Sequence, residues 1–207
     1  MTGRATPPDG PASGLGRERA AAGDAEERAA VRVLTAAFAD DAVIRWLNPQ
    51  VSARMFAFVV AESAAAGGLE VQDETAAAVW LPWSAGGSTP GPATSGPPPE
   101  LPVRLRQYVE LTAARHPSDH DHLYLQFLGV HPACQGKGAG SALLARGLAR
   151  ADAAGLPAYL EASGQANQRL YERHGFVPHG DPILLPDGPA VRPMWREPGI
   201  IPDQPRQ

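Results

Sequence analysis

A glycine-rich hexapeptide, Gln135-Gly-Lys-Gly-Ala-Gly140, carries the clearest chemical signal in the sequence. It follows a mostly apolar run at 122–130 and precedes a helical pattern, so we expect it where a strand passes into a helix. Glycines at such a point let several backbone N–H groups approach one anion. The spacing matches neither the Walker loop, which needs Gly-Lys-Ser or Gly-Lys-Thr, nor the dinucleotide fingerprint. The hexapeptide therefore predicts a phosphate site of another kind.

Two further side chains have types suited to proton transfer, and a third lies on the same helix face as one of them. Tyr171 can donate its hydroxyl proton, and Asn167 precedes it by four residues, which places both on one face of a short helix. Glu161 is an acid within an otherwise apolar run at 157–163, where a carboxylate is costly unless it has a partner. We interpret Glu161 as the first candidate for a general base. A structural hydrogen-bonding role for Glu161 and a packing role for Tyr171 both stay open.

Other polar residues give weaker signals. Asp40 and Asp41 follow the first expected helix and could receive a cationic group, although acids in a loop are usually solvated. The sequence also contains three closely spaced histidines, His116, His120 and His122. They lack a second pair of ligands, so we expect no metal site.

Alternating helices and strands must position these residues. Hydrophobic periodicity and turn residues predict helices at 25–39, 52–66, 102–115, 139–154 and 165–174, and strands at 69–72, 76–82, 122–130 and 157–163. Further extended segments are expected from residue 176 and near 190–196. A strand, loop, helix and strand in that order form a right-handed crossover between two parallel strands. We therefore expect an α/β fold with a mixed sheet.

The length of 207 residues fits a single domain. We place this domain at 24–198, with mobile tails at 1–23 and 199–207. The Pro/Gly/Ser-rich segment 84–102 can form neither helix nor strand, and neither side of it carries enough core alone. We interpret it as a flexible loop within the domain.

Composition and charge narrow the class of protein. The net charge of −4 disfavours nucleic acid as the main partner. No apolar run has the length of a membrane span, and the N-terminus lacks the pattern of a signal peptide. Cys134 is the only cysteine, so an intrachain disulfide is excluded, and we expect it to be a surface residue. These features indicate a soluble, cytoplasmic protein without membrane association.

The run from His122 to Leu144, HLYLQFLGVHPACQGKGAGSALL, resembles the coenzyme A-binding motif of GNAT N-acetyltransferases, whose core is Arg/Gln-x-x-Gly-x-Gly/Ala. Downstream, LEAS at 160–163 and NQRLYERHGF at 167–176 are similar to the second half of that family. Upstream, AAFAD at 36–40 and AVW at 78–80 resemble its puromycin N-acetyltransferase subgroup. The resemblance covers about residues 25–197.

The resemblance implies the GNAT acyl-CoA N-acyltransferase fold, a central mixed sheet flanked by helices, with acetyl-CoA as co-substrate. The strand before the glycine loop would then pair with the pantetheine arm through Leu128, Gly129 and Val130, and Asn167 would contact the cofactor near its thiol. Tyr171 stands where the family has its general acid. The residues expected to hold the pyrophosphate are Gln135, Gly136, Lys137, Gly138, Ala139, Gly140 and Ser141.

The chemistry of acetyl transfer requires side chains of these types. An amine attacks the thioester carbonyl directly, and the charge that develops on oxygen needs a donor such as the Val130 N–H. The departing thiolate needs a proton, which Tyr171 can supply, and the attacking amine must lose one, which Glu161 can accept.

We therefore expect an N-acetyltransferase that acts on a primary amine of a small molecule, as a monomer or homodimer. Two alternatives stay open: a protein or N-terminal acetyltransferase, and a non-catalytic acyl-CoA-binding regulatory module on the same fold. The sequence departs from the family pattern in two places. The family's first strand should precede Asp24, yet 13–22 is a poor strand sequence, and the loop 84–102 is long. Both departures border the acceptor side, so the identity of the amine stays open.

Overall fold

The structure, a computed structural model, describes residues 11–86 and 101–199, without side chains for 11–20 and 49–52. Its helices are α1 (Pro11–Ala37), α2 (Ala42–Leu47), α3 (Pro49–Ala65), α4 (Val103–Ala113), the 3₁₀ turn η1 (Pro132–Cys134), α5 (Ala139–Ala153) and α6 (Gln165–Arg173). Its strands are β1 (Leu69–Gln72), β2 (Ala76–Trp83), β3 (His122–Val130), β4 (Ala158–Ala162), β5 (Val177–Pro178), β6 (Ile183–Leu184) and β7 (Ala190–Arg196).

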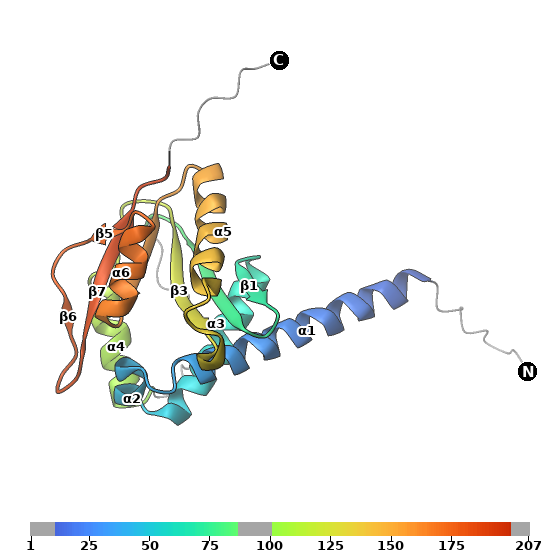
Figure 1. Cartoon of the computed structure of the whole chain (residues 1–207), viewed down its shortest axis with the longest axis horizontal. Coiled ribbons are helices and arrows are strands. Elements are labelled where there is room, and N and C mark those ends of the chain that lie inside the picture. Colours follow the sequence, from blue (N-terminus) through green and yellow to red (C-terminus); the bar gives the residue numbers. More distant parts are fainter. Residues whose placement is uncertain (1–10, 87–100, 200–207) are drawn as a thin grey trace, which may run out of the picture.

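Within the described residues the strands form one sheet in the order β1-β2-β3-β4-β7-β5, with β6 paired to β7 (Figure 1). The β3–β4 pair is parallel and the other pairs are antiparallel. The α5 crossover between β3 and β4 explains the parallel pair, since parallel neighbours need a long connection. The expected mixed α/β sheet flanked by helices is confirmed.

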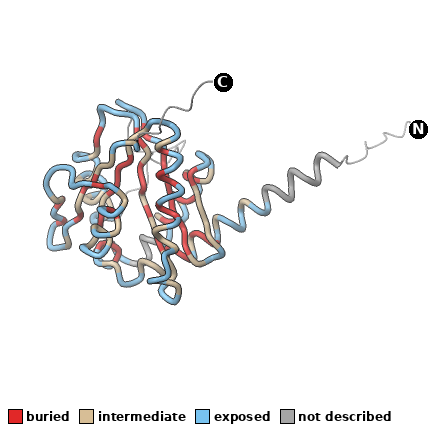
Figure 2. Tube along the Cα trace, turned by 45° about the horizontal axis from the view of Figure 1, so that its top comes forward, coloured by how far each residue is buried: buried red, intermediate tan, exposed pale blue. Residues whose placement is uncertain are grey.

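Strand β2 is buried on both faces of the sheet (Figure 2). Its alternate residues Ala77, Val79 and Leu81 belong to a core formed with α1, α2 and α3. Ala78 and Trp80 belong to a second core, which α5 and α6 cover on the opposite face. Because side chains alternate along a strand, one apolar sequence fills both cores. The sheet is thus the middle layer of three.

Strands β3 and β4 separate soon after they meet. Their pairing is confined to Leu123↔Ala158 and Tyr124↔Tyr159. Beyond this point β3 follows β2 as far as Val130, while β4 follows β7. The register of β2 and β3 also shifts at Val79/Trp80, which leaves Gln126 as an extra residue in β3. One edge of β3 therefore lacks a strand partner where the glycine loop begins.

Helix α1 begins earlier than expected. It starts at Pro11 rather than near residue 25, and its N-terminal end leaves the body of the molecule (Figure 1). Residues 11–23, which we expected in a mobile tail, therefore continue this helix, while 1–10 lie outside the described residues. Accordingly, no strand precedes α1 within the described part of the chain. Neither α1 nor any other helix described is apolar and long enough to cross a membrane.

Helix α2 was not expected from the sequence. The side chain of Asp41 accepts hydrogen bonds from the N–H groups of Val43 and Ile44, which caps the start of this short helix. The buried residues of α2 are Val43, Ile44, Trp46 and Leu47. Packing against the core therefore stabilises a segment too short to show helical periodicity.

The boundaries of the other predicted helices and strands lie close to those of the structure.

Most of the loop 84–102 falls outside the described residues, but hydrogen bonds hold its first residues in place. The N–H of Ala85 donates to the Asp121 carboxylate at 2.7 Å, and the N–H of Gly86 donates to the carbonyl of Ser118 at 2.8 Å. The domain limits of 24–198 stay a prediction.

Candidate active site

The glycine loop leads directly into α5. Gly136 and Gly138 have φ values of 75° and 86°, in the left-handed region that glycine tolerates best. A Cβ at either residue would meet nothing within 4 Å, so both face open space. The N–H groups of Ala139 and Gly140 are in the first turn of α5 and have no partner within that helix. This arrangement can bind an anion such as a pyrophosphate.

Neighbouring side chains fix the conformation of this loop. The Gln135 amide donates to the carbonyl of Val130 at 3.1 Å, and the exposed Lys137 ammonium approaches the carbonyl of Ala133 at 3.5 Å. The Ser141 hydroxyl lies 2.7 Å from Nε2 of His174, at the end of α6. The predicted phosphate residues therefore lie together, and the link to His174 was not foreseen.

The open edge of β3 continues the same surface. The N–H of His131 donates to the carbonyl of Thr75, next to β2. Because backbone groups alternate along a strand, those of Val130 and Leu128 point to the other edge, from which β4 has departed. Gly129 has a separate packing role, since a Cβ there would approach Leu34 and Ala37 of α1 within 3.0 Å.

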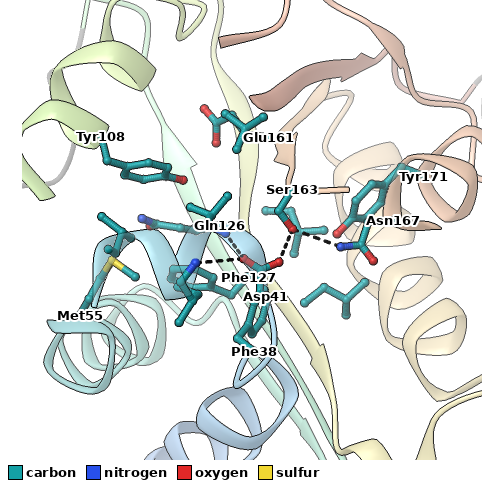
Figure 3. A pocket seen from close by; sticks show the side chains of 16 residues that line it. Phe38, Asp41, Met55, Tyr108, Gln126, Phe127, Glu161, Ser163, Asn167 and Tyr171 are labelled. Atoms are coloured by element: carbon teal, nitrogen blue, oxygen red, sulfur yellow. Dashed lines mark hydrogen bonds between the residues drawn. The ribbon is translucent and has the colours of Figure 1, made fainter. Parts of the chain in front are cut away.

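A cavity lies where β3 and β4 separate (Figure 3). Its empty space, open mouth included, is about 540 Å³. The lining residues are Phe38, Asp41, Val43, Ile44, Leu47, Met55, Tyr108, Leu125, Gln126, Phe127, Leu128, Glu161, Ser163, Asn167, Tyr171 and Val191. No lysine or arginine belongs to this lining, so the carboxylates of Asp41 and Glu161 give the cavity a negative character.

Glu161 is the most perturbed acid in this cavity. Its side chain is only 3% exposed, and its Oε2 accepts a hydrogen bond from the Tyr124 hydroxyl at 2.6 Å. Its Oε1 has no hydrogen-bond partner among the described residues. Burial raises the pKa of Glu161 to about 7, against the lowering effect of Tyr124 and Tyr159. A carboxyl group with such a pKa can exchange protons near neutral pH.

Tyr171 and Asn167 line the cavity on the side away from Tyr108, and Glu161 lies between Tyr108 and Tyr171 in this view (Figure 3). Both belong to α6, and their spacing brings them to one face of that helix, as expected. Tyr171 is 8% exposed, and burial, with a smaller effect of Asp41, raises its pKa. The hydroxyl therefore keeps its proton at neutral pH. The Asn167 amide donates to the Ser163 hydroxyl at 3.3 Å.

Asp41 links the helical layer to strand β4. One carboxylate oxygen caps α2, and the other accepts a hydrogen bond from the Ser163 hydroxyl at 2.7 Å. Asp40, the other acid weighed as an amine receptor, is exposed and is not in the cavity lining. Asp41 therefore has a structural task beside its contribution of charge.

Sequence reasoning missed three polar residues of the cavity. Tyr108 of α4 lines the cavity, and burial together with Glu161 and Asp41 raises its pKa. Gln126 lies at the β-bulge, and Ser163 follows the last residue of β4. Gln126 and Ser163 each interrupt or end an apolar run, which is the one signal that could have singled them out, whereas the sequence around Tyr108 carries no such signal.

The histidines do not form a metal site. His116 and His122 contact each other, with their Nε2 atoms 2.9 Å apart, whereas His120 is exposed. Among the described residues no group of three or more His, Cys, Asp or Glu side chains could hold a metal ion. Cys134 is a free, half-buried thiol in η1, so the expectation of a surface position is met only in part.

Comparison with known proteins connects this geometry to a family. Residues 103–176 match the family model described as "Acetyltransferase (GNAT) family". A crystal structure described as histone acetyltransferase HPA2 and related acetyltransferase from Corynebacterium glutamicum is 28% identical, with a TM-score of 0.60, over 86% of this chain and 94% of that one. Arylalkylamine N-acetyltransferase 2 from Aedes aegypti shares the fold, with a TM-score of 0.59 at 12% identity, over 84% and 95% of the two chains.

The matched segment includes every element that builds the site on the cofactor side. It runs from α4 through β3, the glycine loop, α5 and β4 to the end of α6. The puromycin-like subgroup is not distinguished by these matches and stays a prediction. The separated parallel strands, the glycine loop at the start of α5 and the matches themselves agree, and residues 103–176 are similar to the GNAT family of acetyltransferases.

Proposed function

We propose that this protein transfers the acetyl group of acetyl-CoA to a primary amine of a small molecule. The observation that carries the proposal is the composition of one cavity. A buried acid with a pKa near 7 and a buried tyrosine that keeps its proton both line it (Figure 3). It lies beside an unpaired strand edge and an anion-binding helix start.

The residues of this chain suit acetyl-CoA, which would supply an activated acetyl thioester. The pyrophosphate would be held by the N–H groups at the start of α5 and by the loop residues from Gln135 to Ser141. The edge of β3 offers the backbone of Leu128 and Val130 to an extended pantetheine arm. Gly136 and Gly138 leave open space around the loop, which a Cβ would begin to fill.

The cavity favours an acceptor that carries a positive charge on an apolar body. Phe38, Met55 and Phe127 supply apolar and aromatic walls, and Asp41 and Glu161 supply negative charge. The lack of lysine and arginine in the lining disfavours a carboxylate or phosphate on the acceptor.

In this mechanism Glu161 and Tyr171 perform opposite proton transfers. An ammonium group is not a nucleophile, so Glu161 accepts the proton that the amine must lose. Its pKa of about 7 lets it do so near neutral pH and still be ionised in part of the molecules. The hydroxyl of Tyr171 protonates the departing thiolate, and the N–H of Val130 stabilises the charge on the carbonyl oxygen.

The C. glutamicum structure carries the name of a histone acetyltransferase, which makes a protein substrate the second candidate. The buried position of Glu161, whose side chain is 3% exposed, favours a small acceptor that enters the cavity completely. A non-catalytic acyl-CoA-binding module would need neither a perturbed Glu161 nor a buried Tyr171 hydroxyl.

A thiol-release assay with acetyl-CoA and a panel of acceptors tests the proposal. The panel contains arylalkylamines, aminonucleosides, polyamines, aminoglycosides, free amino acids and a lysine-containing peptide. We expect turnover with apolar primary amines and little with free amino acids, whose carboxylate meets the acids of the cavity. Turnover with the peptide alone would show a protein acetyltransferase. Cofactor binding without any turnover would favour the binding module.

A further inference from the structure

Next to Glu161, two buried histidines lie in contact and have no role in the proposed transfer. His116 follows α4, its side chain is 5% exposed, and its ring packs on Trp83 with centroids 3.9 Å apart. His122 begins β3 and is fully buried. Burying two imidazoles is costly unless their polar atoms are matched, so the pattern of their hydrogen bonds is informative.

A backbone carbonyl determines the direction of these hydrogen bonds. Nδ1 of His122 lies 2.8 Å from the carbonyl oxygen of His120, and a carbonyl only accepts, so this Nδ1 carries the proton. In a neutral imidazole the other nitrogen is then an acceptor, and Nε2 of His122 accepts from Nε2 of His116 at 2.9 Å. Nδ1 of His116 is therefore left with a lone pair.

This lone pair faces the carboxyl group of Glu161. Nδ1 of His116 is 3.9 Å from Oε1 of Glu161, the oxygen without a hydrogen-bond partner, while Oε2 is occupied by Tyr124. An ionised Oε1 would meet a second lone pair there. A protonated Oε1 would meet an acceptor, and an approach of roughly 1 Å would complete a hydrogen bond.

We propose that His116 is a positioning residue for Glu161: His122 and the carbonyl of His120 hold its Nδ1 lone pair toward the carboxyl group, which stabilises the protonated acid and makes Glu161 a stronger proton acceptor. This inference rests on the proposed function, in which Glu161 takes the proton of the amine. Removing the anchor of His116 should therefore weaken Glu161 as a base without removing either group.

The surroundings keep both histidines neutral. Burial, with a smaller effect of His122, lowers the pKa of His116 to about 3. Burial also lowers the pKa of His122, against the raising effect of the His120 carbonyl and of Asp121 and Asp119. Because both rings are neutral, the hydrogen bonds from His116 to His122 and from His122 to the His120 carbonyl keep the same donors and acceptors at the pH where Glu161 titrates.

The other groups that face Glu161 do not reverse this effect. Tyr124 from β3 and Tyr159 from β4 lower its pKa, and burial outweighs them. Tyr108 from α4 shares the cavity, and the charge of Glu161 contributes to the raised pKa of that tyrosine. Asp41, which precedes α2, lines the same cavity and donates no hydrogen bond to Glu161 among the described residues.

The tautomers can be measured directly in the unchanged protein. Two-dimensional ¹⁵N–¹H NMR of histidine-labelled protein distinguishes Nδ1–H from Nε2–H rings, and His116→Gln and His122→Gln assign the signals. We expect Nδ1–H for His122, Nε2–H for His116, and neutral rings for both at pH 6–8. An Nδ1–H or a charged ring at His116 in this range would overturn the proposal.

The effect on Glu161 is tested with His122→Phe, which removes the acceptor for Nε2–H of His116. The ring of His116 then gains by moving its proton to Nδ1, where it donates to the carboxylate. We expect the ¹³C-detected pKa of Glu161 and the acidic limb of the kcat/KM profile to fall together, by about one pH unit. His120→Ala is the matched control, because it removes an exposed ring and keeps the carbonyl, and neither value should move.

An unchanged Glu161 titration in folded His122→Phe would refute the positioning role. If the variant does not fold, the tautomers of the unchanged protein decide the question alone. A carboxyl titration that moves as expected, in a protein that acetylates none of the amines, would support the hydrogen-bond chain and count against the proposed function instead.

Discussion

Glu161→Gln should make the protein more stable at alkaline pH while it lowers activity. The glutamine side chain has nearly the same shape and no charge. Its carbonyl oxygen can accept a hydrogen bond from the Tyr124 hydroxyl, and its amide nitrogen can donate one to Nδ1 of His116. Both polar atoms of the glutamine side chain therefore have a hydrogen-bond partner. The substitution therefore removes one buried negative charge and leaves the packing unchanged.

The magnitude follows from the pKa of the buried acid. Folding raises it from the ordinary 4.5 to about 7, a difference of about 2.5 pH units. Between these values the folded protein keeps a proton that the unfolded chain has lost, so stability falls as the pH rises through this window. Each pH unit corresponds to about 1.4 kcal/mol, which gives a loss of about 3 kcal/mol that is complete above pH 7. Glu161→Gln should not lose this free energy of unfolding, because glutamine does not titrate.

Urea denaturation of both proteins at pH 4, 5, 6, 7 and 8 measures the effect. The free energy of unfolding of Glu161→Gln, relative to the wild type, should increase by about 3 kcal/mol from pH 4 to pH 8. Other groups that titrate, the histidines included, are common to both proteins and cancel in this difference. Glu172→Gln, at an exposed position of α6, is the control and should show no such trend.

Parallel stability curves for the two proteins would refute this reasoning, because they would mean that Glu161 is ionised at no cost in the folded state. The effect of Glu161→Gln on the reaction rate is a separate prediction. If Glu161 is the base, the maximal rate of Glu161→Gln should drop and the acidic limb of the profile should disappear. A variant that is more stable and less active would identify Glu161 as a residue kept for function.

The remaining predictions concern the cofactor loop, the proposed acid and the core. Gly138→Asp should weaken acetyl-CoA binding at least ten-fold in calorimetry, about 1.4 kcal/mol, whereas the uncharged Gly138→Asn should lose much less; equal losses would attribute the effect to the backbone. Tyr171→Phe should keep its melting temperature and lose about 10²–10⁴ in kcat, and a change in KM alone would exclude it as the acid. Gly147→Ala should lower the free energy of unfolding by about 1–3 kcal/mol, because its Cβ would lie 2.3 Å from the buried Trp80 indole. Gly23→Ala, also helical but with open space around it, should be neutral or slightly stabilising, and equal effects would contradict the packing argument.

The sequence predicted those parts of the fold whose signals are local. Strand β2, strand β3 and helix α5 lie within a few residues of the expected ranges, because periodicity and glycine positions report directly on them. Helix α2 was missed because four of its six residues are buried, which leaves no polar face to mark a period. The start of α1 near 25 was wrong, since Asp24 was interpreted as an N-cap although alanine-rich sequence before it continues the helix.

The candidate site shows the same division. Glu161, Asn167 and Tyr171 could be singled out because each stands out from its own segment, and all three line the cavity. Tyr108 could not, since its role depends on how α4 packs against the sheet, which is decided by residues far away in the sequence. The sequence marked Asp41 as a possible charged group of the site, but it could not predict the hydrogen bond between Asp41 and Ser163, because these residues are 122 positions apart.

The separation of β3 from β4 explains why an acid and a base can meet in this fold. Along β4, Tyr159 belongs to the core under α1–α3, whereas Leu160 and Ala162 belong to the core under α5 and α6. By alternation Glu161 projects to the first face, while Tyr171 approaches from the second. In a continuous sheet the backbone would keep two such groups apart. Because pairing ends at Tyr124↔Tyr159, both line one cavity, from opposite faces. The proposed transfer would use this separation, since the amine would lose its proton on one side of the carbonyl carbon while the sulfur would gain one on the other.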